Sequence, residues 1–370
     1  MRRPRKEYFL DYLKDQLVTY LGNKRSLLSL IKTAYDLACD ELDRDAVSVL
    51  DGFAGSGVVS RFFKQSGATR IVSNDFEKYS ASIARCFLSN RSQVDMQEIK
   101  SIVEEIEAHK LDTATPGIIE SHYAPADDEN IQEGERVFYS NRNAKIIDNI
   151  RRSIDNYPEH CRDLLFGPFL SEASIRTNTS GVFKGFYKDS KTGLGKFGGN
   201  NGNALSRILR DVVLSPPVLC DLECKNEVHC KDINKLITEI DPVDFAYYDP
   251  PYNQHPYGSN YHMLNTIYSY VPPTNPSRVA GIPTDWQRSE YNYTRRVHKA
   301  LEHLLQHTPS NVIAFSYNSE GHVNFDEFVE MCENYGELEV LDKEYNTFRG
   351  SKNLTNRNKY VTEYVFIVFK

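Results

Sequence analysis

The chain has 370 residues, of which 40% are hydrophobic and 26% are charged, the composition of a globular protein with one large domain or two ordinary ones. Its net charge of −7 does not favour a polyanionic partner, although an average over the chain can hide a local basic patch. No run of apolar residues approaches the roughly 18 that a membrane span needs, so we expect no membrane partner.

The number of cysteines and the composition of the first residues help to predict the cellular compartment. Seven cysteines, an odd number scattered along the chain, favour reduced thiols over a disulfide framework. Residues 1–14 start with basic side chains but lack the apolar core of a secretion signal. We therefore expect a cytoplasmic protein.

The first predicted elements form a βαβ unit. Apolar side chains recur at helical spacing in residues 24–38, which predicts an amphipathic helix. The run AVSVL at 46–50 predicts a strand and the glycine-rich DGFAGSG at 51–57 a turn, followed by a helix and a second strand that ends with TRIVSND at 69–75. With parallel strands and a right-handed crossover, this unit begins a doubly wound α/β sheet.

The turn after the first strand has the composition of a cofactor site. Gly52, Gly55 and Gly57 let the backbone approach a ligand closely at the carboxyl end of the strand. Asp75 follows Gly57 by 18 residues (75 − 57), near the offset of about 20 at which an acidic residue meets ribose hydroxyls in dinucleotide folds. Together these features predict a cofactor that carries a nucleoside.

Two further residues indicate which cofactor binds at this turn. A pyrophosphate site would need a third glycine where this chain has Ser60. Asp51 places negative charge beside the turn, which suits a cationic ligand better than a phosphate. S-adenosylmethionine, a sulfonium with an amino group and no phosphate, fits both observations.

The alternation of strands and helices is lost between residues 91 and 224. This segment is polar at 121–135 and rich in glycine and asparagine at 192–203, so we expect a mostly helical insertion with a mobile basic loop. The predicted catalytic domain comprises residues 1–90 and 225–370, and the predicted insertion comprises residues 91–224.

Positive charge is concentrated in two stretches of this acidic chain. Residues 171–211 hold seven Lys/Arg against three Asp/Glu (7 − 3 = +4), and residues 343–360 hold five against one (5 − 1 = +4). Two solvated surfaces would explain these counts as well as a contact with a polyanion would. The stretch RTNTSGVFKGFYK at 176–188 adds hydroxyls, amides and aromatic rings, which are groups that contact phosphates and base edges.

One cluster has the ligand types of a zinc site, with four soft ligands within eleven residues: Cys220, Cys224, His229 and Cys230. If residues 227–232 form a strand, the adjacent His229 and Cys230 point to opposite faces and cannot bind one ion. We therefore predict ordinary thiols beside a sheet, and no metal.

The second half of the chain continues the strand pattern. Apolar runs lead up to residue 248 and span 311–317, 338–345 and 364–369, and the last two predict an antiparallel hairpin at the sheet edge. After the first run comes YYDPPYNQHPYGSNY at 247–261, whose prolines exclude the middle of a helix or a central strand. A rigid exposed loop at the end of a buried strand is a position where catalytic residues are often found.

Four separated motifs, in this order, make the chain resemble the Dam-like amino-methyltransferases that act on adenine in DNA. YLGNK at 20–24 resembles the family's amino-terminal cofactor motif, FAGSG at 53–57 its glycine loop, CKDI at 230–233 the strand ahead of the catalytic loop, and DPPY at 249–252 its catalytic tetrapeptide. The resemblance covers most of the chain outside the insertion. It implies an α/β fold, a Rossmann-like S-adenosylmethionine-dependent methyltransferase sheet with an inserted, mostly helical target-recognition segment.

The resemblance also implies the roles of individual residues. Asp249 and the carbonyl of Pro250 would each accept one hydrogen of the adenine amine, so that its lone pair points at the methyl group. Pro251 would keep that carbonyl rigid, and Tyr252 would offer a ring face to a base flipped out of the duplex. The expected cofactor-binding residues are Tyr20, Gly22, Lys24, Asp51, Phe53, Gly55, Gly57, Asp75, Asp232 and Ile233.

We expect double-stranded DNA as the partner, and a cognate restriction endonuclease as a second one if the enzyme is the modification half of a restriction system. The expected DNA contacts are Arg176, Asn178, Lys184, Lys188, Lys191, Lys196 and Asn260. His255, Asn260 and Tyr261 would either close over the flipped base or the DNA backbone, or belong to a loop packed on its own side chains.

Three alternatives stay open from the sequence. The first is an enzyme that methylates adenine in RNA, and the second is one that methylates the amine of cytosine in DNA. The third is a DNA-binding module that keeps the fold but does not catalyse a reaction. The intact stretch from Asp249 to Tyr252 speaks against the last of these. The recognition sequence and the oligomeric state cannot be read from side-chain types.

Overall fold

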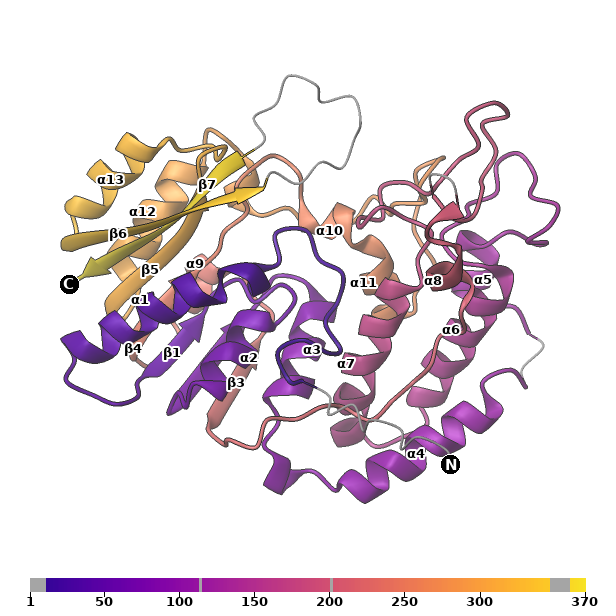
Figure 1. The fold of residues 1–370 in the computed structure, drawn as a ribbon, viewed down its shortest axis with the longest axis horizontal. Coiled ribbons are helices and arrows are strands. Elements are labelled where there is room, and N and C mark those ends of the chain that lie inside the picture. Colours follow the sequence, from indigo (N-terminus) through magenta and orange to yellow (C-terminus); the bar gives the residue numbers. More distant parts are fainter. Residues whose placement is uncertain (1–10, 113–114, 200–201, 347–359) are drawn as a thin grey trace, which may run out of the picture.

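The computed structural model describes residues 11–112, 115–199, 202–346 and 360–370. They form a seven-stranded sheet with helices on both faces and a group of further helices beside it (Figure 1). In these ranges no helix is long and apolar enough to cross a membrane. Most of the basic stretch predicted at 343–360 lies outside them.

The sheet has the order β3-β2-β1-β4-β5-β7-β6. Its strands are β1 (Ser48–Asp51), β2 (Arg70–Asn74), β3 (Lys225–His229), β4 (Val243–Tyr248), β5 (Ser310–Asn318), β6 (Glu337–Asn346) and β7 (Tyr360–Phe369). Strands β1 to β5 pair in parallel, whereas β7 pairs antiparallel with both β5 and β6. The predicted antiparallel pair is therefore confirmed, but β7 lies inside the sheet and β6 forms its edge.

Side chains along the central strands alternate between two hydrophobic clusters, as the period of a strand buried on both faces requires. Val49 and Phe245 pack with α1 (Leu28–Glu41) and α2 (Val58–Gln65) on one face. Leu50 and Ala246 pack on the other face with α9 (Ile233–Leu236), α12 (Val297–His307) and α13 (Phe325–Glu333). The predicted doubly wound α/β sheet is thus confirmed.

The regular structure of the described residues between 91 and 224 is helical, as predicted, although more than half of the segment lies in turns and loops. Its helices are α4 (Met96–His109), α5 (Ile118–Tyr123), α6 (Asn141–Ile154), α7 (Glu159–Ile175) and α8 (Leu205–Leu209). Helices α4 to α7 share one hydrophobic core with α3 (Lys78–Leu88) and α11 (His262–Ser269), which belong to the flanking sequence. In Figure 1, α3 accordingly lies between the sheet and the helices of this segment.

The strand order places two loops at the same edge of the sheet. β1 is paired with β2 on one side and with β4 on the other, and Asp51 at the end of β1 lies opposite Tyr247 of β4. The chain therefore reverses its direction of winding between β1 and β4, and the loops after both strands leave the sheet side by side. In open α/β sheets this is where ligands bind.

Candidate active site

The turn after β1 approaches its neighbours so closely that it needs glycine. Gly55 and Gly57 have φ values of 52° and 76°, in the left-handed region that other residues disfavour. A Cβ on Gly52 would lie 2.5 Å from the ring of Tyr248, and one on Gly55 would lie 3.0 Å from the ring of Tyr20. Gly57 then serves as the N-cap of α2. These constraints account for the glycine spacing of the strand-to-helix turn.

Asp75 fixes the shape of this turn through backbone hydrogen bonds. Its Oδ2 accepts from the Gly55 N–H at 2.7 Å, and its Oδ1 accepts from the Glu77 N–H at 2.8 Å. Burial raises the pKa of Asp75, although these hydrogen bonds act to lower it. Burial also raises the pKa of the neighbouring Glu77 to about 7. Two carboxyl groups therefore lie together at the end of β2.

Asp51 lies beneath the turn and is fully buried. Its Oδ2 accepts from the Ser60 hydroxyl at 2.6 Å, whereas its Oδ1 has no hydrogen-bond partner among the described residues. Burial raises the pKa of Asp51 to about 7, and the nearby carboxylates of Asp249 and Asp75 add to the shift. Ser60, in the place of a third glycine, thus binds a carboxylate at the turn.

One pocket joins the glycine turn, the N-terminal motif and the loop after β4. It contains about 700 Å³ of space free of protein atoms, part of which is open to solvent. The residues that line it are Tyr20, Gly22, Asn23, Lys24, Phe53, Ala54, Gly55, Ser56, Val58, Val59, Asp75, Phe76, Glu77, Asp249, Pro251, Tyr257, Gln287, Ser289 and Asn292. Among them the carboxyl groups of Asp75, Glu77 and Asp249 outnumber the ammonium of Lys24, which suits a cationic ligand.

Asp249 is held by Tyr252 and Lys24. The Tyr252 hydroxyl donates to Asp249 Oδ1 at 2.6 Å, and Lys24 Nζ lies 2.6 Å from that hydroxyl and 3.0 Å from the same Oδ1. The side chain of Lys24 is only 4% exposed, so water screens this ion pair weakly. No hydrogen bond between described residues ends on Asp249 Oδ2. One oxygen of the carboxylate is therefore fixed and the other is available to a ligand.

A second buried carboxyl group, that of Glu363 on β7, lies near Lys24. Its Oε2 is 3.8 Å from Lys24 Nζ and has no hydrogen-bond partner among the described residues. Burial raises the pKa of Glu363. No sequence signal marks this residue, because it lies far from the four motifs in a run that predicts only a strand.

Stacked tyrosine rings join the N-terminal motif to the loop after β4. The ring of Tyr20 lies nearly parallel to those of Tyr257 and Tyr261, with centroids 5.1 Å and 4.5 Å away. The Tyr261 hydroxyl accepts from the Leu21 N–H, and Gly22 adopts a φ of 76° next to the Tyr257 hydroxyl. Tyr261 is fully buried, so it belongs to this packed loop and does not face DNA here.

Four predicted cofactor residues do not line the pocket: Asp51, Gly57, Asp232 and Ile233. Asp232 caps α9, where its Oδ1 accepts from the Asn234 N–H at 2.9 Å. Ile233 packs in the hydrophobic cluster that also holds Tyr248. Phe53 does line the pocket, and its ring meets the edge of Tyr291 at 5.1 Å.

The predicted DNA contacts differ in their exposure. Lys184, Lys188, Lys191 and Lys196 are exposed. Asn178, by contrast, is fully buried, and its amide donates to the carbonyls of Val137 and Lys196 and accepts from the Gly198 N–H. In this conformation the backbone uses the hydrogen-bonding groups of the Asn178 side chain, and its contact with a base stays a prediction.

Two other predicted DNA contacts are also engaged within the protein. Arg176 pairs with Glu172 and donates to the carbonyl of Arg207. Asn260 is buried, and its main-chain carbonyl accepts from the Phe183 N–H. Neither side chain faces solvent as a base reader would, whereas His255 on the same loop is exposed.

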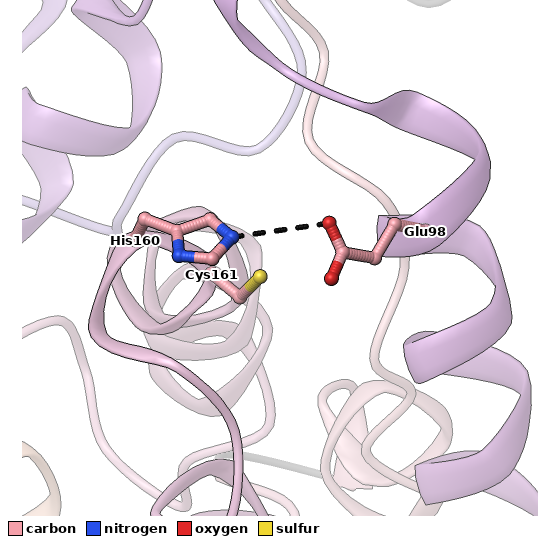
Figure 2. Close-up of side chains that lie close together, drawn as sticks. All are labelled: Glu98, His160 and Cys161. Carbon is pink, nitrogen blue, oxygen red and sulfur yellow. Dashed lines mark ion pairs between the residues drawn. The ribbon is translucent and has the colours of Figure 1, made fainter.

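Side chains of metal-ligating types gather at one place in the described ranges, between α4 and α7 (Figure 2). His160 Nε2 lies 3.8 Å from Glu98 Oε2, and Cys161 lies beside them. Burial raises the pKa of Cys161, which favours the thiol over the thiolate that binds metals. The group is separate from the pocket lining. Of the earlier zinc candidates, Cys220 and Cys224 pack in two different hydrophobic clusters.

Several residues that line the pocket belong to no sequence motif and were not predicted. Gln287, Ser289 and Asn292 come from residues 285–296, which contain no motif and reach the pocket only through tertiary folding. Glu77 follows Asp75 by two residues, and its position after β2 is the one signal that could have identified it.

Comparison with known proteins agrees with this geometry. Residues 20–331 match the model of the D12 class N6 adenine-specific DNA methyltransferases. The type II methyltransferase M.NlaIII of Neisseria lactamica is 28% identical over 362 residues, which cover 95% of this chain and 99% of that protein. The type II methyltransferase M.CviAII of Paramecium bursaria Chlorella virus 1 is 26% identical over 359 residues, 95% of this chain and 98% of that protein.

The modification methylase StsI of Streptococcus sanguinis is 27% identical over 366 residues, which cover 94% of this chain but 51% of that protein. The family model spans most of the chain and includes both the glycine turn and the loop after β4. This chain therefore belongs to the D12 class of N6 adenine-specific DNA methyltransferases.

Proposed function

We propose that the pocket between the glycine turn and the loop after β4 is the catalytic centre, where a methyl group passes from S-adenosylmethionine to the exocyclic amine of an adenine in duplex DNA. One observation carries this proposal. Asp249, whose Oδ2 accepts no hydrogen bond from a described residue, lines the same pocket as the glycine turn and the carboxyl groups at the end of β2.

S-adenosylmethionine suits the pocket in charge. The buried Oδ1 of Asp51, which has no partner among the described residues, and the carboxyl groups of Asp75 and Glu77 favour a ligand with positive charge and hydroxyl donors. The left-handed turn lets the backbone approach that ligand without a Cβ. When bound, the cofactor supplies an electrophilic methyl group. Asp75 and Glu77 would hold its ribose hydroxyls.

The adenine amine needs activation because its lone pair is delocalised into the ring. Asp249 Oδ2 would accept one amine hydrogen, and the carbonyl of Pro250 would accept the other. The nitrogen then becomes more tetrahedral and its lone pair points at the methyl group. Tyr252 and Lys24 hold the other carboxylate oxygen at 2.6 Å and 3.0 Å, which fixes the direction of Oδ2.

A base inside a duplex cannot reach this pocket, so we also propose that the target adenine is flipped out. The ring of Tyr252 would stack on it, a contact worth about 1–3 kcal/mol per base. Lys24 Nζ lies 4.8 Å from the centroid of that ring, and the centroid of the Tyr317 ring lies 5.0 Å from it at an interplanar angle of 62°.

The segment 91–224 is proposed as the target-recognition part, with its exposed lysines on the DNA backbone. The names of the relatives support a place for this enzyme in a restriction-modification system, where methylation protects DNA from a cognate endonuclease. The family match supports adenine in DNA over adenine in RNA or a cytosine amine.

The test is methyl transfer from tritiated cofactor to duplex DNA and RNA, followed by identification of the methylated base and mapping of its position. Asp249→Ala should lower the single-turnover rate by at least about a thousandfold while calorimetry shows cofactor binding largely retained, because the carboxylate serves the amine. Asp241→Ala, which removes an exposed carboxylate just ahead of β4, is the matched control and should keep the rate. A folded Asp249→Ala enzyme with near wild-type rate would remove Asp249 from its role.

A further inference from the structure

A cationic side chain lies beside the catalytic loop on a segment that no motif marks. Arg288 Nη2 donates to the carbonyl of Gln254 at 3.2 Å. The residues on either side of it, Gln287 and Ser289, line the pocket, whereas Arg288 itself is exposed. Arg288 therefore stands at the rim of the pocket and is bonded to the loop that begins with Asp249.

Aromatic rings hold the guanidinium of Arg288 in place. Its Cζ lies 5.7 Å from the ring centroid of Trp286 and 4.8 Å from that of Tyr293. Arg296 also lies over Tyr293, at 4.7 Å, but it pairs with Glu290. In the part of the chain that the structure describes, no carboxylate lies within ion-pair distance of Arg288. Arg288 is thus oriented, exposed and without a counter-charge.

The insertion brings a second cation to the same loop. The Phe183 N–H donates to the carbonyl of Asn260 at 2.7 Å, and His262 Nε2 lies 3.0 Å from the carbonyl of Phe183. These contacts dock residue 184 against the catalytic loop. Lys184 is exposed and likewise has no ion pair with a described carboxylate. Burial and the positive charge of Arg288 lower the pKa of Lys184.

The third group of this cluster is His255, on the catalytic loop itself. Burial and the positive charge of Lys184 lower the pKa of His255, so these groups from three segments act on one another through like charge. Such repulsion is unfavourable in the free protein and is relieved when an anion lies between the cations. The chain has more carboxylates than cationic side chains, with a net charge of −7. Even so, no carboxylate among the described residues forms an ion pair with Arg288 or Lys184.

We propose that Arg288 and Lys184 clamp the DNA phosphate that flanks the target adenine, with His255 at the edge of the clamp. This inference rests on the proposed function. A guanidinium held against two aromatic rings can bind a phosphate through two parallel hydrogen bonds, and Lys184 adds a point charge from the insertion. Because Arg288 also holds the carbonyl of Gln254, phosphate binding and the position of the catalytic loop are linked.

The experiment uses duplexes in which one phosphate is replaced by an uncharged methylphosphonate. The target adenine is first mapped with the wild-type enzyme on unmodified duplex. A methylphosphonate beside that adenine should weaken wild-type binding about tenfold or more, through loss of charge-assisted hydrogen bonds, and one placed a helical turn away should not. In the double variant Arg288→Ala with Lys184→Ala, the same replacement should cost nothing further, because its partners are already absent.

Two variants and one binding measurement serve as controls. Lys299→Ala removes an exposed positive charge from α12 and should keep the full methylphosphonate effect. Arg288→Lys keeps the charge without the planar fork and should keep part of that effect. Cofactor affinity, measured by calorimetry, reports that each variant is folded.

The outcomes separate the two proposals. An undiminished methylphosphonate effect in the double variant, or a loss of affinity no greater than that of Lys299→Ala, overturns the clamp and leaves the proposed function intact. Absence of methyl transfer to any unmodified duplex overturns the proposed function instead.

Discussion

Lys24 is a cation on the wall of a pocket that suits a cation. Its ammonium is bound to Asp249 and Tyr252, and Glu363 lies 3.8 Å away. The YLGNK motif predicts a cofactor contact, and Lys24 does line the pocket, but its observed contacts are those of a positioning residue for the carboxylate that we propose to be catalytic. An ammonium near a sulfonium would oppose cofactor binding, and its two carboxylate neighbours offset that effect.

Lys24→Ala should therefore lower the single-turnover rate at saturating cofactor by about a hundredfold, since Asp249 loses one of the two groups that orient it. Cofactor affinity should stay the same or increase, because a positive charge leaves the pocket. Stopped-flow or quench kinetics measures the first effect and calorimetry the second. Lys32→Ala, on the exposed face of α1, is the control and should change neither. A large loss of cofactor affinity with an unchanged rate would instead show that Lys24 contacts the cofactor, as the YLGNK motif predicts.

Asp51 and Glu77 should give cofactor binding a pH dependence. Burial raises both pKa values to about 7, above the values near 4 of free carboxyl groups. The free enzyme should lose stability as pH rises from about 4 to 7, because the unfolded chain ionises first. A cationic ligand favours the ionised forms, so affinity for S-adenosylmethionine should rise between about pH 6 and 8.

Calorimetry at several pH values, in buffers of different ionisation enthalpy, detects both the change in affinity and the protons released on binding. S-adenosylhomocysteine lacks the sulfonium charge and should show a weaker dependence. Equal pH profiles for the two ligands would show that these carboxyl groups do not respond to the sulfonium charge.

At the scale of elements, the turn between β1 and α2 combines backbone strain with crowding. Gly55 has a φ of 52°, and a Cβ at this position would lie 3.0 Å from the ring of Tyr20, whereas Gly67 has a φ of 85° and a Cβ there would meet no atom within 4 Å. Alanine at either position meets the left-handed penalty of about 1–2 kcal/mol. Gly55→Ala should lose further stability and weaken cofactor binding at least about tenfold, and Gly67→Ala should affect only stability. Urea unfolding and calorimetry on both variants check this, and identical behaviour would contradict it.

The elements that the sequence predicts best are those whose signal is local. The βαβ unit from β1 to β2 follows from β-branched runs and a glycine turn, and the structure confirms it. The position of β7 between β5 and β6 does not follow in the same way. Two neighbouring strands show the same hydrophobic pattern whichever of them forms the edge, so the choice depends on pairing with β5.

In the candidate site, too, the residues in local sequence motifs are the ones that the sequence predicts. Motif residues such as Gly55, Asp75 and Asp249 line one pocket, as their positions after parallel strands predict. Asn178 shows what the sequence cannot predict. Its side chain has a donor and an acceptor, but only the structure shows that backbone groups of Val137 and Gly198 already use them. Arg288 shows the converse case, in which a side chain outside every motif is brought to the pocket rim by tertiary contacts alone.

For the molecule as a whole, the insertion and the catalytic part are not independent bodies. Tyr79 and Phe87 of α3, and Leu264 and Ile267 of α11, belong to the same hydrophobic cluster as α4 to α7. The boundary at residue 91 is therefore a boundary in sequence pattern, while the core continues across it. An exchange of residues 91–224 between relatives would have to preserve these packing surfaces.

An acidic protein that binds DNA needs its positive charge concentrated on one surface, because long-range repulsion would otherwise oppose binding. Replacing Lys188, Lys191 and Lys196 together by alanine should weaken binding to every duplex alike, since phosphates carry no sequence information. The slope of log affinity against log salt should fall by about 0.9 for each phosphate that no longer meets a cation, with cofactor affinity unchanged. The control is the triple variant Lys32→Ala, Lys100→Ala and Lys299→Ala, which removes the same charge from exposed positions elsewhere. If both triple variants show the same salt slope, DNA does not lie on the 188–196 loop, and the basic stretch at 343–360 becomes the surface to test.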